Sequence, residues 1–480
     1  MKGRNNMKKF LSLLLCALMV FSLAACGGKN SDEVTTLKWL VFGASQPDLP
    51  KVMEKVNAII EPEIGVKLEM QFIESGAYAE RLRMNMASQG DFDLCYVNGS
   101  MYNDGVSKGG LMDILPIMKK MKSPLLEKIP DYVWDAATVD GSIYAVPNEQ
   151  IFATQTGVML RADLVEKYNF DVSTVKEFRD IEPFLAAVAA GEPDVYPMRQ
   201  NFGVPALYPN IYEYNRATQT AYVLETGKTV PFVETPGFWE GVETIRDWYV
   251  KGYIRQDADT TTDDSLDYLS GNYAAYKVVI KPGVEAEEEA KLKRDLIAVP
   301  TSEPYITTDT VVATMTAVSA TCKAPEKAIK FLELINTNAE LYNLICYGIE
   351  GVHYDKLDNG HISLKEGSNY NPNSSWMFGC QYNALLLENQ EDGIWEETAA
   401  LNAGAVCSPL LGFTIDTAPI RTESAQCLAV FTEYDKILNC GSEDPSVYKG
   451  EMLSKLKQAG IDKVVAEVER QTKEFFNSKK

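Results

Sequence analysis

The sequence predicts an α/β fold in which two lobes each contain strands covered by helices. Residues 37–98 alternate apolar strands with amphipathic helices, in the order strand, helix, strand, helix, strand, and this order builds a largely parallel sheet. A second region of strands and helices begins near residue 155, and the apolar run at 311–320 returns the chain toward the first region. We therefore expect two α/β lobes that are joined by more than one segment.

The elements of the first lobe follow from their periodicity. The run LKWLVFG at 37–43 is apolar and short, as a buried strand is. Pro47 opens a helix whose apolar residues recur at helical spacing. VKLEMQF at 66–72 alternates apolar and polar residues, which predicts a half-buried strand. A helix over 77–88 and a strand over 92–98 complete the pattern.

The second region follows the same logic with more irregular spacing. TVDGSIYAVP at 138–147 predicts a tight hairpin, and the strand TQTGVML at 154–160 starts the second lobe. Apolar residues at helical spacing predict a helix over 238–252. The charged run at 285–294 predicts a solvated helix face, and an amphipathic helix over 460–476 closes the chain.

The first 25 residues have the pattern of a secretory signal peptide. Four basic residues and no acidic residue precede an apolar run at 10–25, which is shorter than the roughly 20 residues that a membrane-spanning helix needs. The run ends in Leu-Ala-Ala-Cys, which resembles the lipobox of bacterial lipoproteins, so Cys26 is the expected lipidation site. Residues 26–36 are small and polar, as a tether linker is. The alternative interpretation is that the apolar run beginning at residue 10 forms a buried helix of the protein core.

The charge of the chain argues against two classes of partner. Without the four basic residues of the signal, 42 basic and 67 acidic residues remain, a formal net charge of −25. Such a surface repels nucleic acid and anionic lipid headgroups, so we expect neither as a direct partner. Seven cysteines remain beyond Cys26, none at CxxC spacing, and most are expected to be buried thiols.

Signatures of catalysis are missing from the sequence. It contains no GxxxxGK[ST], GxGxxG, HExxH or GxSxG motif. The only two histidines, His353 and His361, lie eight residues apart on either side of a turn and do not have the spacing of a metal pair. We expect no cofactor, no metal and no enzymatic activity. A carboxylate pair of the glycosidase type stays open, because 67 acidic residues allow many accidental pairs.

The chain resembles a family of transport proteins in the order and spacing of several sequence blocks. These blocks are FGASQPDLPKV, GDFDLCYVN, VDGSIYAVPN, YGIEGVHYD, SPLLGFTID and KLKQAGIDKVVAEVERQ. They resemble the family-1, carbohydrate-type extracellular solute-binding lipoproteins of Gram-positive ABC importers. The match is nearest to the LipO-like subset, which carries a C-terminal domain of unknown function.

The resemblance implies a type II periplasmic-binding-protein fold with a ligand cleft between the lobes. The first lobe would comprise residues 37–148 and 310–345, and the second would comprise 149–309 and 346–480 with the family-specific C-terminal segment. Crossings would fall near Pro147 and over 300–311. The resemblance also implies closure about a hinge when a ligand binds.

Candidate ligand contacts are polar or aromatic side chains near strand ends and crossings. A sugar presents hydroxyl groups and an apolar ring face, which Asp, Glu, Asn and Gln bind through hydrogen bonds and flat aromatic rings bind by stacking. In parallel sheets, ligands sit at the carboxyl ends of the strands. The candidates are Gln46, Asp48, Asp93, Asn98, Glu149, Gln150, Glu350, Tyr354 and Trp376.

The resemblance thus implies a monomeric, lipid-anchored substrate-binding component of an ABC transporter on the outer face of the cell membrane. Its expected partners are a small-molecule solute, a mono- or oligosaccharide, and the permease subunits that receive it. Two alternatives stay open. The same fold could bind a peptide or another polar solute or serve as a sensor subunit, or the chain could be a surface glycoside hydrolase.

Overall fold

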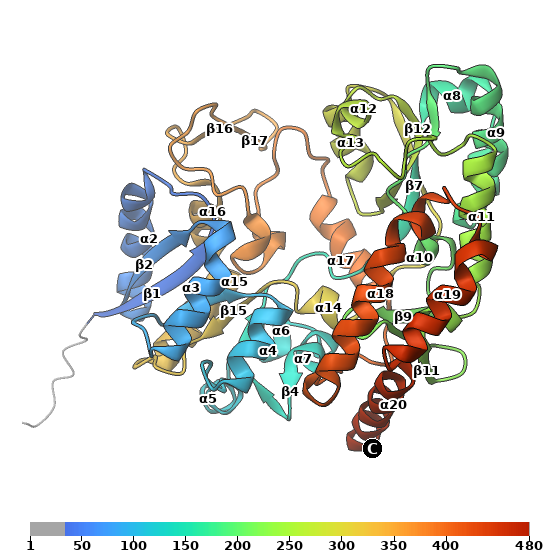
Figure 1. Ribbon diagram of the computed structural model, residues 1–480. Coiled ribbons are helices and arrows are strands. Elements are labelled where there is room, and N and C mark those ends of the chain that lie inside the picture. The colour runs from blue at the N-terminus through green and yellow to red at the C-terminus, as the bar shows by residue number, and fades with distance from the viewer. Residues whose placement is uncertain (1–33, 480) are drawn as a thin grey trace, which may run out of the picture.

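The computed structural model describes residues 34–479, and the lipidation site predicted at Cys26 lies outside these residues. Two α/β bodies stand side by side in Figure 1, the first mostly blue and the second mostly green to red. Each has its own buried core, one built around Trp39 and the other around Trp248. The expected two-lobed α/β architecture is therefore present, and we call these bodies lobe 1 and lobe 2.

Lobe 1 is built on a five-stranded sheet with the order β2-β1-β3-β15-β6. The first three strands run parallel, whereas β15 is antiparallel to both of its neighbours. The strands are β1 (Thr35–Phe42), β2 (Val66–Ile73), β3 (Leu94–Val97), β6 (Ala145–Pro147) and β15 (Met315–Val318). Its helices are α2 (Leu49–Ile64), α3 (Ser75–Ala87), α4 (Gly99–Ser107), α5 (Leu115–Met121), α6 (Leu125–Lys128), α7 (Asp131–Ala137), α15 (Pro325–Thr337) and α16 (Ala339–Tyr347).

Lobe 2 contains two sheets, of the orders β13-β7-β12-β8 and β11-β10-β9. The strands are β7 (Thr156–Arg161), β8 (Tyr196–Met198), β12 (Tyr273–Val279), β13 (Leu296–Pro300), β9 (Tyr212–Asn215), β10 (Thr220–Val223) and β11 (Lys228–Pro231). The helices are α8 (Ala162–Lys167), α9 (Glu182–Gly191), α10 (Val204–Leu207), α11 (Phe238–Val250), α12 (Ser265–Leu269), α13 (Val284–Leu292), α18 (Arg421–Cys440), α19 (Pro445–Gln458) and α20 (Ile461–Ser478). The last three helices pack against α11 or β11 and so belong to this lobe.

Three segments cross between the lobes, at 148–155, 301–314 and 405–417. They pair with one another through the backbone: Thr154 exchanges two hydrogen bonds with Tyr305 (2.8 and 3.0 Å), and β14 (Tyr305–Ile306) runs parallel to β18 (Val406–Cys407). The second segment also contains α14 (Thr308–Val311), and α17 (Ile394–Gly404) precedes the third. The crossings are therefore held together by the two-stranded pair β14-β18 and by one isolated bridge between Thr154 and Tyr305, and we call this ribbon of paired crossings the hinge.

One assignment from the sequence differs from the observed packing. Residues 346–385 were expected in lobe 2, but their buried side chains belong to the core of lobe 1. Phe378 is fully buried and packs edge-on against Trp39, with 5.7 Å between ring centroids. The segment carries β16 (Tyr354–Lys356) and β17 (Ile362–Leu364). Within the stretch 346–480, it is the part after the third crossing that packs in the core of lobe 2. The reason is the apolar content of this segment, which completes the first core.

The predicted hairpin within 138–147 forms as expected, whereas the predicted strand over 311–320 is shorter than expected. The strands β4 (Thr138–Val139) and β5 (Ser142–Ile143) pair across Asp140 and Gly141, which both have positive φ as a type I′ turn requires. The run at 311–320 forms a strand only over β15, because Thr307 accepts a hydrogen bond from the backbone N–H of Thr310 and starts α14 instead.

Candidate functional site

Gln46 and Asp48 lie in the loop between β1 and α2 and fasten it to the later segment of lobe 1. The side-chain oxygen of Gln46 accepts a hydrogen bond from the backbone N–H of Asn371 (2.7 Å). Nε2 of His353 lies 3.3 Å from the carboxylate of Asp48, and the ring is 1% exposed. The hydrogen bond from Lys51, and then that from His353, lower the pKa of Asp48. Both candidates are therefore committed to contacts within the lobe.

Glu350 and Tyr354 lie next to this contact but differ in exposure. Glu350 is exposed to solvent. Tyr354 is 7% exposed and packs edge-on against Tyr347, and burial raises its pKa. Tyr354 thus packs as a core residue, whereas Glu350 keeps a free carboxylate at the surface.

Asp93 and Asn98 stand at opposite ends of β3. The carboxylate of Asp93 accepts a hydrogen bond from the backbone N–H of Lys38 (2.9 Å) at the amino end of the strand. Asn98 follows the carboxyl end and caps α4, where its side-chain oxygen accepts from the N–H of Met101 (3.0 Å). Since ligands of such sheets sit at the carboxyl ends of strands, Asn98 is on the expected edge and Asp93 is on the other.

Glu149 and Gln150 begin the first crossing segment, as expected, but Glu149 is not free. Glu149 is 6% exposed, and its carboxylate pairs with the ammonium group of Lys128, which also lies 3.4 Å from the thiol of Cys380. Burial works against the charge of Lys128, but Cys380 and Glu149 together hold its pKa above the usual value. The backbone carbonyl of Gln150 accepts from Asn402 (2.7 Å). These residues fix the hinge to lobe 1.

Trp376 belongs to an aromatic cluster at the carboxyl edge of the lobe 1 sheet. Its ring centroid is 5.8 Å from Phe42, the last residue of β1, and 6.2 Å from Tyr96 in β3. The Tyr96 hydroxyl donates to the carbonyl of Ala313 (3.1 Å), which fixes that ring. Trp376 is partly exposed, whereas Tyr96 is buried. The cluster of Phe42, Tyr96 and Trp376 therefore holds one indole at the edge where the fold predicts a ligand.

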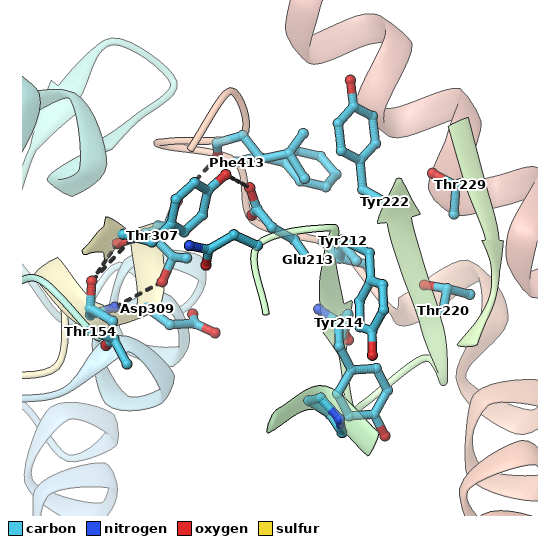
Figure 2. A pocket seen from close by; sticks show the side chains of 18 of the residues that line it. Thr154, Tyr212, Glu213, Tyr214, Thr220, Tyr222, Thr229, Thr307, Asp309 and Phe413 are labelled. Atoms are coloured by element: carbon cyan, nitrogen blue, oxygen red, sulfur yellow. Dashed lines mark hydrogen bonds between the residues drawn. The ribbon is translucent and has the colours of Figure 1, made fainter. Parts of the chain in front are cut away.

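A cavity of about 450 Å³ lies beside the crossing segments, and we call it the hinge cavity. Its walls come from the sheet β9-β10-β11, from the crossing segments with α14, and from α20 (Figure 2). Tyrosine and threonine side chains dominate the lining, and both sides in Figure 2 contribute hydroxyl groups. None of the nine predicted residues lines this cavity.

Glu213 joins the hinge cavity to two of the crossings. Its carboxylate accepts hydrogen bonds from the hydroxyl of Tyr305 (2.8 Å), in the second crossing, and from Ser408, in the third. No basic side chain takes part in these two bonds, and burial raises the pKa of the Glu213 carboxyl. Glu213 was not among the residues predicted from the sequence. The tyrosine-rich stretch YPNIYEYN, in which it lies, is the signal that marks the region as a binding surface.

Within residues 34–479, no three His, Cys, Asp or Glu side chains gather as a metal site would require. In the same range, no helix combines the length and apolar character needed to cross a membrane. All seven cysteines in this range are free thiols.

Comparison with known proteins places these features in a family. Residues 46–340 match the bacterial extracellular solute-binding proteins, and residues 409–477 match a domain of unknown function, DUF3502. A carbohydrate ABC transporter substrate-binding protein of Streptococcus pneumoniae is 27% identical, over 99% of this chain and all of its own length. The polygalacturonan/rhamnogalacturonan-binding protein YtcQ of Bacillus subtilis is 20% identical over 75% of this chain and 77% of its own.

Solved structures extend the likeness to the fold. The N-glycan transport solute-binding protein NgtS of Streptococcus pneumoniae is 26% identical, with a TM-score of 0.81 over 93% of this chain and 100% of that chain. Its complexes with Man1GlcNAc and Man5GlcNAc give TM-scores of 0.69 and 0.66, over 92% and 93% of this chain and 100% and 99% of those chains, at the same identity. The expected two-lobed fold is confirmed, and the chain belongs to the family of bacterial extracellular solute-binding proteins.

Proposed function

We propose that this protein is the substrate-binding component of a carbohydrate ABC importer. It binds an oligosaccharide between its lobes, closes about the hinge, and presents the sugar to permease subunits without altering it. The observation that carries this proposal is the full-length likeness to an N-glycan transport solute-binding protein, in sequence and in fold.

The aromatic cluster of lobe 1 gives the proposal a physical contact. A sugar ring has an apolar face of C–H groups that packs on an indole, and Trp376 offers such a face at the carboxyl edge of the sheet. Glu350 and Gln150 remain the predicted polar candidates near this edge. Gln46, Asp48, Asn98 and Glu149 act first as structural residues in the present arrangement and would reach a sugar only by giving up these contacts. Asp93 lies at the opposite edge of the sheet.

The TM-scores are consistent with an open arrangement of the lobes. The same streptococcal protein superposes better in the structure described without a sugar (0.81) than in its two complexes (0.69 and 0.66). A change in lobe angle lowers such a score without changing either lobe. We infer that the structure described here is the form that receives a ligand and that closure follows binding.

The anchor completes the proposal. Export by the signal peptide and lipidation of Cys26 would hold the protein on the outer face of the cell membrane, near its permease, and the linker over 26–36 would give it reach. A Cys26→Ser variant should leave the membrane fraction and appear in the medium. Wild-type retention of that variant in the membrane would contradict the anchor.

Titration with oligosaccharides tests the function. Man1GlcNAc and Man5GlcNAc are the first probes, because the streptococcal relative binds them. We expect saturable binding by calorimetry and a rise in the unfolding midpoint, since a ligand of the folded state stabilises it. Trp376→Ala should weaken affinity at least tenfold through loss of the stacking surface.

A matched control is Trp239→Ala, which removes a half-buried indole from α11 in lobe 2 and should leave affinity unchanged. Chromatography of the sugar after long incubation tests the hydrolase alternative. Shortened products that disappear when a single carboxylate is replaced would overturn the transport proposal. Binding of peptides in place of sugars would overturn the substrate class.

A further inference from the structure

We propose that the hinge cavity is a second ligand site, separate from the cargo site, for a neutral saccharide of one or two rings. The inference rests on the proposed function only in taking the edge at Trp376 as the cargo site. Its evidence is independent of that edge: the size of the cavity, the chemistry of its lining, and its place beside the crossing segments.

The cavity has the volume of a small-molecule site. Its roughly 450 Å³ falls in the range of about 300–1,000 Å³ that such pockets occupy. Its walls come from three parts of the chain that are distant in sequence, namely β9 to β11, the second and third crossings, and α20. A void bounded by three separate elements is part of the architecture.

The lining selects against anions. Among the described residues that line the cavity, none is Lys, Arg or His, whereas two carboxyl groups, Glu213 and Asp309, are present. A phosphate or carboxylate ligand would therefore be repelled by these carboxyl groups and would find no cationic side chain in the lining to pair with. Burial raises the pKa of Tyr208 and of Tyr214 to about 12, so the phenols are neutral donors.

The same lining favours a saccharide over an amine. Glu213 already accepts hydrogen bonds from the hydroxyl groups of Tyr305 and Ser408. Toward a ligand it therefore acts as a hydrogen-bond acceptor more than as an unpaired negative charge that would attract an amine. Asp309 is exposed at the edge of the cavity. Five tyrosines contribute aromatic surface to the lining, on which the C–H groups of a sugar can pack, and the threonines provide hydroxyl groups that both donate and accept. The tyrosines are Tyr208, Tyr212, Tyr214, Tyr222 and Tyr305.

The position of the cavity separates it from the predicted cargo contacts. Neither the aromatic cluster nor any of the nine predicted residues lines it. In Figure 1, α14, β9 and α20 lie below α17, whereas β16, β17, α12 and α13 stand above it. The cavity thus has a lining of its own, which shares no residue with the predicted cargo contacts.

Its place at the hinge predicts coupling to cargo. The crossings must bend when the lobes rotate, and they form one wall of the cavity. A molecule that bridges this wall and β9 therefore binds one lobe angle better than the other and changes the affinity for cargo, with a reciprocal effect of the cargo on its own affinity.

The experiment measures binding of D-glucose, D-galactose, N-acetylglucosamine and maltose to the full-length protein by calorimetry and saturation-transfer NMR. Thr414→Trp places an indole in the cavity from an exposed position, and Thr414→Ser is its matched control. Tyr222→Ala is a second variant, which deletes a ring from the wall. Circular dichroism confirms that each variant folds.

We expect at least one of these sugars to bind wild type, Thr414→Ser and Trp376→Ala alike and to bind Thr414→Trp and Tyr222→Ala at least tenfold more weakly. Its presence should change the oligosaccharide affinity of wild type severalfold. Absence of binding by all four sugars would overturn the second site, as would binding lost in Trp376→Ala, which would make the cavity part of the cargo site. Oligosaccharide binding is measured in a separate titration. A failure of the proposed transport function can therefore be told apart from a failure of the second site.

Discussion

The two carboxylates beside the hinge, Glu149 and Glu213, differ in the groups that donate hydrogen bonds to them. Glu149 lies on the lobe 1 side and pairs with the ammonium group of Lys128. Glu213 lies on the lobe 2 side and accepts hydrogen bonds from the hydroxyl groups of Tyr305 and Ser408. The first is an ion pair within one lobe, and the second is a hydrogen-bonded link from a lobe to two crossings.

This difference shows which end of the hinge is fixed and which is adjustable. A buried charge pair is costly to separate, so the first crossing stays attached to lobe 1. A carboxyl held by hydroxyl donors loses less when one bond is replaced by water or by a sugar hydroxyl. We therefore expect lobe rotation to involve rearrangement around Glu213, while the contacts of Glu149 persist.

Breaking the ion pair should have the largest effect. Lys128→Met leaves the carboxylate of Glu149, whose side chain is 7% exposed, without its partner, and the free energy of unfolding should fall by about 2–3 kcal/mol. This is below the usual loss for a buried pair, because Lys128 is 33% exposed. Urea denaturation measures it. The control Lys120→Met removes an exposed partner of Glu326 and should cost less than about 1 kcal/mol. Equal losses would refute the distinction.

Removing one hydroxyl donor should have an intermediate effect. Tyr305→Phe deletes the 2.8 Å hydrogen bond to Glu213 and should lower the free energy of unfolding by about 1 kcal/mol. Ser408→Ala removes the other donor and should give a loss of similar size. The same denaturation experiment measures both. A loss for Tyr305→Phe as large as that of Lys128→Met would mean that Glu213 is as firmly fixed as Glu149.

Neutralising Glu213 should have the smallest effect at any single pH and should show itself in the pH dependence. Because burial raises the pKa of this carboxyl above its ordinary value of 4.5, the folded state holds the proton more tightly than the unfolded state. Its contribution to stability is complete below pH 4.5 and is lost as pH rises through the raised pKa. Glu213→Gln should therefore gain stability relative to wild type between pH 4 and pH 7.

Denaturation curves at a series of pH values check this sign. Glu303→Gln, an exposed position in the same crossing, is the control. If Glu213→Gln instead loses stability relative to wild type as the pH rises, the carboxylate is stabilised as an anion, and the contrast with Glu149 disappears.

The fold could be predicted from the sequence where the signal is local. The alternation in β2, the apolar run of β1 and the Asp140–Gly141 turn each determine an element within a few residues. The packing of residues 346–385 could not be predicted in this way. Phe378 meets Trp39 across more than 300 positions, and no short-range periodicity reports such a contact.

The candidate site shows the same limit. Trp376 was predicted as a contact because a flat aromatic ring can stack on a sugar, and the structure sets it beside Phe42 and Tyr96. Glu149 was identified from its place at the crossing, but its partner Lys128 lies 21 positions away, so the ion pair could not be foreseen. The hinge cavity was missed because its walls come together only in three dimensions.

The ribbon of paired crossings has a consequence for how the protein withstands cleavage. Three separate chain segments connect the two lobes, and backbone hydrogen bonds join these segments to one another. A single protease cut in any one of them leaves two intact, so the halves should remain together in solution after nicking. For an extracellular protein, such redundancy would preserve the working unit after a cut that would divide a singly linked pair.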